Sequence, residues 1–265
     1  MLKKYYYYFF LLSLAFILFY NPNYKLIVAG IAIFLIGMTF MEDGFKLFGG
    51  GMLEKILHLS TDKLPKAIAT GFIATTLMQS SSLVSIIIIS FLSAELMALS
   101  GAIGVMLGSN IGSTTTAWIV SSLGVKVDIA AFAMPMIIFG VAFKFAKNKG
   151  YQGLGKILLG LGFVFLGIAY TKDGFVLLQE TFDMSKFAVK GYLGALVYIS
   201  IGIFTTAMLR SSGAAMALII TALAANQIVY INALELAIGA NIGTTVTAIL
   251  GAISSNANGK RVAVA

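Results

Sequence analysis

The 265-residue sequence contains no cysteine, only one histidine and only three prolines. Without cysteine, the chain can form no disulfide and offers no thiolate for catalysis or metal binding. The single histidine, His58, excludes any site that needs two imidazoles. Charged residues are also scarce, at 11% of the chain, whereas ordinary soluble domains carry about 25%. These absences exclude thiol chemistry and disulfide scaffolds, and they argue against a water-soluble domain.

Apolar residues take the place of the missing charges. They make up 59% of the chain, and the mean hydropathy is +0.97. A water-facing surface of this composition would expose apolar patches large enough to aggregate, and a disordered chain requires low hydrophobicity. The apolar stretches are continuous, unlike the alternating strands of a membrane barrel. The sequence therefore predicts an all-α, polytopic membrane protein, embedded in the lipid bilayer of the cell membrane and expected in a bacterial inner membrane.

The net charge is +8, which in a soluble protein could indicate a nucleic-acid partner. Here the basic residues are scattered between the apolar stretches, as expected for loops that orient a protein in the membrane. The sequence has no basic stripe with interleaved aromatic residues, so we expect no nucleic-acid binding.

Seven apolar stretches predict the membrane helices. They cover about residues 26–41, 67–93, 101–121, 127–144, 153–170, 191–225 and 232–253. A span needs about 20 residues, so the stretches 67–93 and 191–225 are long for one span and short for two. Residues 1–25 resemble a signal peptide but lack a small-x-small cleavage site, which predicts an uncleaved anchor helix. The mixed segment 42–66 predicts a short amphipathic helix at the membrane interface.

An internal repeat organises the chain, because matching residues recur 130 or 131 positions apart. The matches pair Gly37, Asp43, Gly44 and Phe45 with Gly167, Asp173, Gly174 and Phe175, Thr75 and Thr76 with Thr205 and Thr206, and Gly108, Asn110 and Gly112 with Gly239, Asn241 and Gly243. Transporters are often built from such duplications. We therefore predict an anchor helix at 1–25, a first transport repeat at 26–152 and a second at 153–265. Residue 265 corresponds to Met134, so the second repeat is expected to lack its last helix.

The orientation of the two repeats depends on the polar segments near residues 79 and 210. If each segment crosses the membrane once, the repeats are parallel; if each enters and turns back, they are inverted. Both arrangements place the same number of basic residues on each side, so the charges do not decide. Residues 67–78 form an arm of about 18 Å, which reaches the middle of the bilayer but does not cross it. The arm length therefore favours two inverted repeats, each with a re-entrant helical hairpin.

Polar side chains at bilayer depth are costly unless they are satisfied, so runs of them need a reason. Four runs supply the candidate ion- and substrate-binding residues. They are Thr75, Thr76, Gln79, Ser80, Ser81 and Ser82; Thr205, Thr206, Arg210, Ser211 and Ser212; Asn110, Thr114 and Thr115; and Asn241, Thr244 and Thr245. Hydroxyl and amide oxygens suit Na⁺, whereas hydroxyls, N–H groups and helix N-termini suit an oxyanion. The alternative is that these hydroxyls bond back to helix carbonyls and only assist packing.

The paired Gln79-Ser80-Ser81-Ser82 and Arg210-Ser211-Ser212 segments, with the paired Gly-x-Asn-Ile-Gly segments at 108–112 and 239–243, resemble the type II sodium–phosphate cotransporter family. The similarity covers roughly residues 26–261. It implies Na⁺-coupled symport of inorganic phosphate by alternating access, with both serine-rich loops re-entrant and inverted. The family's binding loops fall on these two polar segments. Transported Na⁺ would lie at the loop tips, with no resident metal or cofactor.

Arg210 departs from the family pattern, which usually has glutamine at this place. We predict a fixed cation that contacts the phosphate through two hydrogen bonds, because charges inside a membrane are usually functional. The alternative is that Arg210 reaches the interface or pairs with an acid such as Glu235. Glu95 and Glu235 are expected to be loop or interface charges, with ion coupling as the alternative. Asp43 and Asp173 are expected to end helices at turns beside glycine.

The predicted function is therefore secondary active transport of phosphate with Na⁺. Two alternatives stay open: a Na⁺-coupled carrier of another small anion, and a membrane scaffold or sensor that transports nothing. The sequence shows no acid–base pair, metal cluster or nucleotide-binding loop, so we expect no enzyme. Whether the chain forms a homo-oligomer stays open.

Overall fold

The computed structural model describes residues 22–49, 63–124, 129–181, 191–253 and 255–264. Within these ranges every regular element is a helix, which confirms the all-α prediction. The helices are α2 (Pro22–Gly49), α4 (Leu64–Met78), α5 (Ser81–Ser93), α6 (Leu99–Gly124), α7 (Ile129–Lys144), α8 (Lys149–Thr181), α9 (Gly191–Leu209), α10 (Ser212–Ala224), α11 (Tyr230–Ala252) and α12 (Ala257–Val264). The predicted anchor helix before residue 22, and His58, lie outside the described residues.

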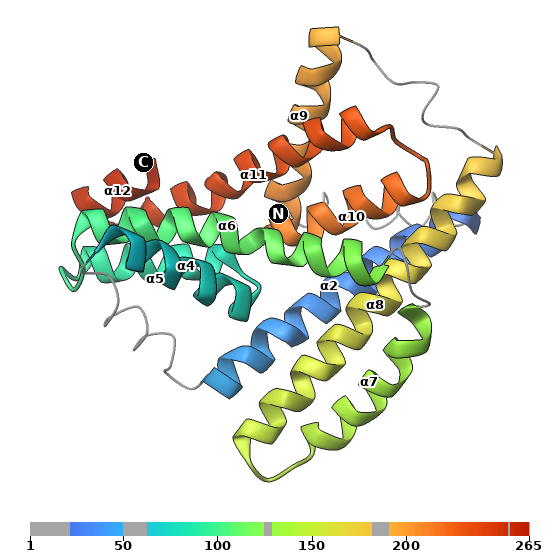
Figure 1. The fold of residues 1–265 in the computed structure, drawn as a ribbon, viewed down its shortest axis with the longest axis horizontal. Coiled ribbons are helices and arrows are strands. Elements are labelled where there is room, and N and C mark those ends of the chain that lie inside the picture. Colours follow the sequence, from blue (N-terminus) through green and yellow to red (C-terminus); the bar gives the residue numbers. More distant parts are fainter. Residues whose placement is uncertain (1–21, 50–62, 125–128, 182–190, 254, 265) are drawn as a thin grey trace, which may run out of the picture.

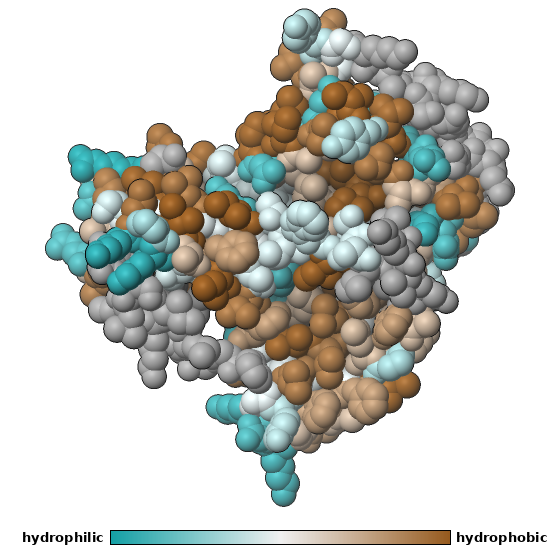
Figure 2. Space-filling model, viewed as in Figure 1, coloured by the Kyte–Doolittle hydropathy of each residue, from teal (hydrophilic) through white to brown (hydrophobic). Residues whose placement is uncertain are grey.

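Four of the helices are long and apolar enough to cross a membrane. They cover Tyr24–Leu47, Lys149–Leu178, Gly191–Leu209 and Tyr230–Ala252. Many of their large apolar side chains are exposed, and Figure 2 shows hydrophobic residues over most of the visible face, with hydrophilic residues gathered toward its edges. A surface of this kind is stable against lipid rather than water, so the chain is a membrane protein.

The long helices α2 and α8 lie side by side and run antiparallel (Figure 1). Glycines set this contact. A Cβ atom added at Gly37 would lie 2.7 Å from the carbonyl oxygen of Gly160, and one added at Gly44 would lie 2.8 Å from that of Gly153. Partner numbers fall as the α2 numbers rise, which defines the antiparallel direction. Small residues allow the two backbones to approach this closely, as is common between membrane helices.

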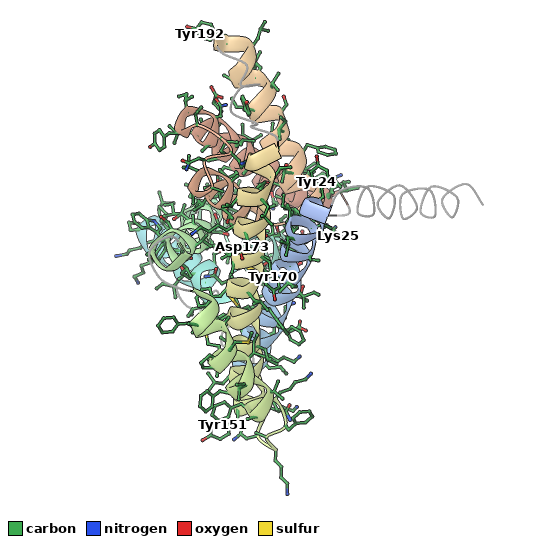
Figure 3. The ribbon with its side chains drawn as sticks, turned by 90° about the vertical axis from the view of Figure 1, so that its right-hand side faces the viewer. Tyr24, Lys25, Tyr151, Tyr170, Asp173 and Tyr192 are labelled. Atoms are coloured by element: carbon green, nitrogen blue, oxygen red, sulfur yellow. The ribbon has the colours of Figure 1, made fainter. Side chains whose placement is uncertain are left out.

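Asp43 and Asp173 do not end helices, contrary to the prediction. Asp43 lies inside α2, which continues to Gly49, and Asp173 lies inside α8, which continues to Thr181. Figure 3 shows Asp173 along α8 at the level of Tyr24 and Lys25, at the start of α2. An aspartate followed by glycine is typical of a turn, but Gly44 and Gly174 serve the close contact between α2 and α8. Residues 42–49 accordingly belong to α2 and not to a separate interfacial helix.

Each ambiguous apolar stretch forms two helices. The stretch 67–93 divides into α4 and α5, and 191–225 divides into α9 and α10. The packing of the two halves repeats: α4 lies against α6, and α9 lies against α11. A Cβ atom at Gly112 would lie 2.6 Å from the carbonyl oxygen of Phe72, and one at Gly243 would lie 2.7 Å from that of Ile203. These four residues are related by a shift of 131 positions, so the sequence repeat extends to individual backbone contacts.

The glycines between α2 and α8 generate a stability prediction. Replacing Gly37 by alanine places a methyl group 2.6 Å from the amide nitrogen of Val164. We expect this substitution to destabilise the detergent-solubilised protein by about 1–3 kcal/mol, because the backbones must separate. The measurement is thermal unfolding.

Gly251 in α11 is the matched control. Its added Cβ would meet only side-chain atoms of α5, at 3.4 Å and 3.9 Å. Alanine there is expected to be neutral or to stabilise by up to about 1 kcal/mol, because alanine favours the helix. Equal melting temperatures for the Gly37 variant and the wild type would contradict the role of the glycine contact.

Candidate functional site

The first polar loop joins α4 to α5 through a sharp reversal of backbone conformation. Gln79 has φ 51° and ψ 24°, the left-handed region, and Ser80 is extended. The Ser80 hydroxyl accepts a hydrogen bond of 3.3 Å from the backbone N–H of Leu83 and so caps the N-terminus of α5. A non-glycine residue with positive φ carries backbone strain, and such strain concentrates at functional sites.

The second polar loop repeats this geometry 131 residues later. Arg210 has φ 54°, and Ser211 is extended and caps α10 by accepting from the N–H of Ala214 at 3.2 Å. The sequence Leu-Arg-Ser-Ser therefore folds as Met-Gln-Ser-Ser does. Both α5 and α10 present the positive end of the helix dipole and their free N–H groups at the loop, which favours an anion nearby.

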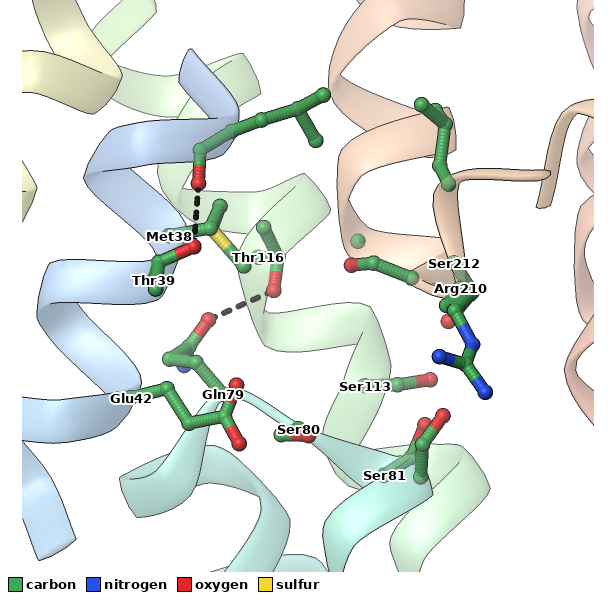
Figure 4. A pocket seen from close by; sticks show the side chains of 15 residues that line it. Met38, Thr39, Glu42, Gln79, Ser80, Ser81, Ser113, Thr116, Arg210 and Ser212 are labelled. Carbon is green, nitrogen blue, oxygen red and sulfur yellow. Dashed lines mark hydrogen bonds between the residues drawn. The ribbon is translucent and has the colours of Figure 1, made fainter. Parts of the chain in front are cut away.

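The two loops meet at one cavity of about 330 Å³ (Figure 4). It is lined by Leu35, Met38, Thr39, Glu42, Gln79, Ser80, Ser81, Ser82, Ser113, Thr116, Leu209, Arg210, Ser211, Ser212 and Gly213. All seven residues predicted on the two loops are therefore brought together. Ser81 and Ser212 are 7% and 5% exposed, and their hydroxyls form no hydrogen bond with the described part of the chain. The hydroxyls of these largely buried residues border the cavity and are available to a ligand.

Gln79 is held by a hydrogen-bond network that reaches α6. Its Oε1 accepts from the hydroxyl of Thr116 at 2.7 Å, and its Nε2 donates to the carbonyl of Thr76 at 2.6 Å and to the hydroxyl of Thr115 at 3.3 Å. These bonds fix the orientation of the amide on the cavity wall. The polar run on α6 thus supports the first loop.

Arg210 behaves differently from Gln79 although it occupies the same place in the fold. Its side chain is exposed and forms no ion pair or hydrogen bond with the described residues. The alternative pairing with Glu235 is therefore not formed. One carboxylate oxygen of Glu235 is buried without a partner. Figure 4 shows the guanidinium of Arg210 at the side of the cavity where Ser81 and Ser113 lie.

The threonines that precede the loops pack between helices and do not line this cavity. Thr75 donates a hydrogen bond of 2.8 Å to Ser109 of α6, and both side chains are buried. The backbone contacts repeat with a shift of 131 positions here, so Thr75 corresponds to Thr206 and not, as the sequence match predicted, to Thr205. The Thr206 hydroxyl is buried without a partner among the described residues, because Ala240 stands where Ser109 stands in the first repeat. The Thr76 hydroxyl is likewise buried without a partner, and Thr205 is half-buried.

The candidate residues on α6 and α11 do not gather at one site. Asn110, Thr244 and Thr245 line a second cavity of about 110 Å³ together with Ser85. Thr114 donates to the carbonyl of Ile111, and Asn241 donates to that of Ala237, and both side chains are exposed. The hydroxyl-to-carbonyl alternative therefore applies to Thr114, and equally to Thr115, Thr244 and Thr245, whose hydroxyls also donate to carbonyls of their own helices. The second cavity is separate from the loop site.

Four polar residues of the main cavity were absent from the predicted site. Thr39 and Glu42 come from α2, and Ser113 and Thr116 come from α6. The two α6 residues directly flank the predicted Thr114 and Thr115, so their position was accessible to sequence reasoning. Glu42 was assigned to an interfacial segment because α2 was expected to end at residue 41. Only the length of α2 brings Glu42 to the loops.

Comparison with known proteins gives a consistent picture. The sequence profile of the Na⁺/Pi-cotransporter family matches residues 33–173 and 184–260. The chain is 29% identical over 238 residues to the uncharacterized protein YqeW of Bacillus subtilis, covering 89% of this chain and 75% of that protein. It is 28% identical over 239 residues to the protein named "Putative inorganic phosphate export protein YjbB" of Escherichia coli.

The coverage of these relatives is unequal. The match to the Escherichia coli protein covers 90% of this chain but 43% of the relative, so the chain spans less than half of that protein's length. Sodium-dependent phosphate transport protein 2A of the mouse is 32% identical over 98 residues, which are 36% of this chain and 15% of that protein. No solved structure matches the chain.

The unequal threonines of the two repeats generate a second stability prediction. Replacing Ala240 by serine supplies Thr206 with the partner that Ser109 gives to Thr75. Because the first repeat accommodates serine at this place, we expect a stabilisation of about 0.5–1.5 kcal/mol, measured by thermal unfolding in detergent. Ser109→Ala is the reciprocal variant and should destabilise by about 1–3 kcal/mol, since it leaves the Thr75 hydroxyl without that partner. A destabilising Ala240→Ser would contradict the equivalence of the two positions.

Proposed function

The chain belongs to the Na⁺/Pi-cotransporter family, and we propose that it moves inorganic phosphate across the membrane together with Na⁺ by alternating access. The observation that carries the proposal is the convergence of both polar loops on one cavity. Two helix N-termini, the cavity-lining hydroxyls of Ser81 and Ser212 and one arginine supply hydrogen-bond donors for a tetrahedral oxyanion.

Na⁺ would bind through the hydroxyl and amide oxygens of the same loops. Serine and glutamine oxygens are hard, neutral ligands of the type that discontinuous transporter helices offer to Na⁺. A cation and an anion that occupy neighbouring places attract each other, so each increases the affinity for the other. This coupling is what a symporter requires. Na⁺ and phosphate are both substrates here.

Inverted repeats would provide the alternating access. The equivalent helices α2 and α8 are antiparallel neighbours, as expected when a two-fold axis perpendicular to both relates the repeats. Helix lengths support a re-entrant first loop, because α4 and α5 have 15 and 13 residues; in the second repeat α10 has 13 residues, whereas α9 has 19 and is long enough to cross. At 1.5 Å per residue, the short helices α4, α5 and α10 reach about 20 Å and do not cross a hydrocarbon core of about 30 Å. Rocking of one repeat against the other would then expose the loop tips to either side.

The direction of net transport is a separate question. An inward Na⁺ gradient would drive phosphate uptake in a symporter, whereas the name of the Escherichia coli relative refers to phosphate export. The same binding site serves either direction, since transport is reversible and follows the gradients. The domain limits at residues 25 and 152, and the absence of a cofactor, stay predictions.

Reconstituted transport tests the proposed function. Full-chain protein in liposomes should take up ³²P-phosphate when Na⁺ is applied outside, and uptake should fall to that of empty liposomes when K⁺ replaces Na⁺. Preloading the vesicles with phosphate and Na⁺ should give efflux by the same route. Na⁺-independent phosphate flux would contradict the coupling.

Other outcomes of the same assay separate the remaining readings. Na⁺-driven uptake of a different anion, without phosphate uptake, would favour a carrier of another small anion. Absence of flux for every anion, with correctly folded protein, would favour a scaffold or sensor.

Arg210→Gln tests the role of the exposed guanidinium in this site. The substitution restores the residue found in the first loop and removes a charged donor. We expect the apparent affinity for phosphate to fall about tenfold or more, because a hydrogen bond to a charged group is worth about 1.5–3 kcal/mol. Because the removed charge stands where a bound cation could stand, the Na⁺ dependence of uptake should become steeper. Initial rates of uptake at varied phosphate and Na⁺ measure both effects.

Arg261→Gln is the matched control, because Arg261 is the other arginine of the chain and lies on α12, outside the cavity. It should leave both parameters unchanged. An Arg210→Gln protein with wild-type phosphate affinity and Na⁺ dependence would exclude Arg210 from the anion site.

A further inference from the structure

The main cavity contains an acid as well as a base. Among the residues that line it, Glu42 is the only carboxylate and Arg210 is the only basic residue. Figure 4 shows them on opposite sides, with Ser80, Ser81 and Ser113 between them in that view. The donors described above account for the binding of an anion. A carboxylate in an anion site opposes that binding and needs its own explanation.

Glu42 is positioned by α2 and by one ion pair. Its Oε1 lies 2.9 Å from the Nζ of Lys46, one helical turn further along, and its side chain is 34% exposed. In Figure 4 the side chain extends from α2 toward Gln79 and Ser80. Lys46 does not line the cavity. An ionised carboxylate has two oxygens and only accepts hydrogen bonds, so it retains acceptor capacity for a ligand in the cavity.

We propose that Glu42 selects a tetrahedral oxyanion that carries a proton. Inorganic phosphate and arsenate hold at least one O–H at neutral pH, and that O–H can donate a hydrogen bond to the carboxylate. Sulfate carries no proton at this pH, so it can offer Glu42 only negatively charged oxygen. Two negatively charged oxygens at hydrogen-bonding distance repel each other, so the carboxylate disfavours an anion that cannot place a proton between them. The cavity thus has donors on the Arg210 side and an acceptor on the Glu42 side.

This inference rests on the proposed function, and it names the class of substrate that the loop site takes. A different use of Glu42 would be as a ligand of the coupling Na⁺. The ion pair with Lys46 opposes that use, because an ammonium group 2.9 Å away repels a second cation at the same carboxylate. Acceptance of a hydrogen bond from the substrate adds no charge, and the Lys46 pair does not hinder it.

Direct binding tests the selectivity without requiring transport. The full chain, purified in detergent and in Na⁺ buffer at neutral pH, is titrated calorimetrically with inorganic phosphate, arsenate and sulfate. We expect phosphate and arsenate to bind with similar affinity, and sulfate to bind at least about tenfold more weakly. In Glu42→Gln, the ratio of phosphate to sulfate affinity should fall by at least about tenfold, because the amide can donate to sulfate and no longer repels it.

Asp43→Asn is the matched control, since it makes the same charge change one residue along α2. Asp43 is outside the cavity lining, is 49% exposed and lies 3.7 Å from Lys156. Its ratio of phosphate to sulfate affinity should equal that of the wild type. Glu42→Asp keeps the acceptor and should retain most of the selectivity.

Two results would overturn the inference. The first is a wild type that binds sulfate as tightly as phosphate, which needs no variant. The second is an unchanged affinity ratio in Glu42→Gln; a change in the Na⁺ dependence of phosphate binding in that variant would then assign Glu42 to the cation. In both cases phosphate still binds and the proposed function stands, whereas a wild type that binds no phosphate overturns the inference and the proposed function.

Discussion

A polar group that leaves water for the interior of a membrane protein must find its hydrogen-bond partner within the protein or in a bound ligand. This constraint explains the arrangement around the first loop, where Thr115 and Thr116 of α6 satisfy the Gln79 amide and Ser80 caps α5. Two further hydroxyls on the loops can take a partner from a ligand. The hydroxyls of Ser81 and Ser212 face a cavity without partners in the described chain. A polar substrate that binds there can form hydrogen bonds with these groups in place of the hydrogen bonds with water that it loses.

The part of the cavity wall that α2 supplies depends on a different interaction, the close approach of α2 and α8. Glycines at positions 30, 37 and 44 let the helices run in contact along their length, and α2 therefore extends without interruption past Thr39 and Glu42 to Gly49. These two residues reach the loops only because the helix does not end at residue 41. Packing between two long helices thus decides which charges enter the binding site, although no glycine of α2 lines it.

Sequence reasoning located the loops because duplication leaves a mark in the sequence itself. When a motif occurs twice at constant spacing, each copy identifies the equivalent residues of the other copy. Gln79 and Arg210, which are equivalent in this way, do share one backbone conformation and one cavity. The duplication gives no comparable signal for where a helix ends. Gly44 and Gly174 occur beside charges, as in turns, and only the neighbouring helix reveals that they are contact residues. The separation of Asn110 and Thr244 into a second cavity was equally inaccessible, because it depends on how α6 and α11 pack.

The two repeats share a backbone arrangement but present different chemistry to the cavity. Gln79 and Arg210 stand at equivalent positions and both line the cavity, whereas Glu42 lines it and its equivalent Lys172 does not. A strictly symmetric site would surround a substrate with identical groups on both sides. Here the first repeat contributes Glu42, a hydrogen-bond acceptor, and the second contributes Arg210, a charged donor. Duplication therefore accounts for the shape of the site, and divergence at a few positions within that shape accounts for its polarity.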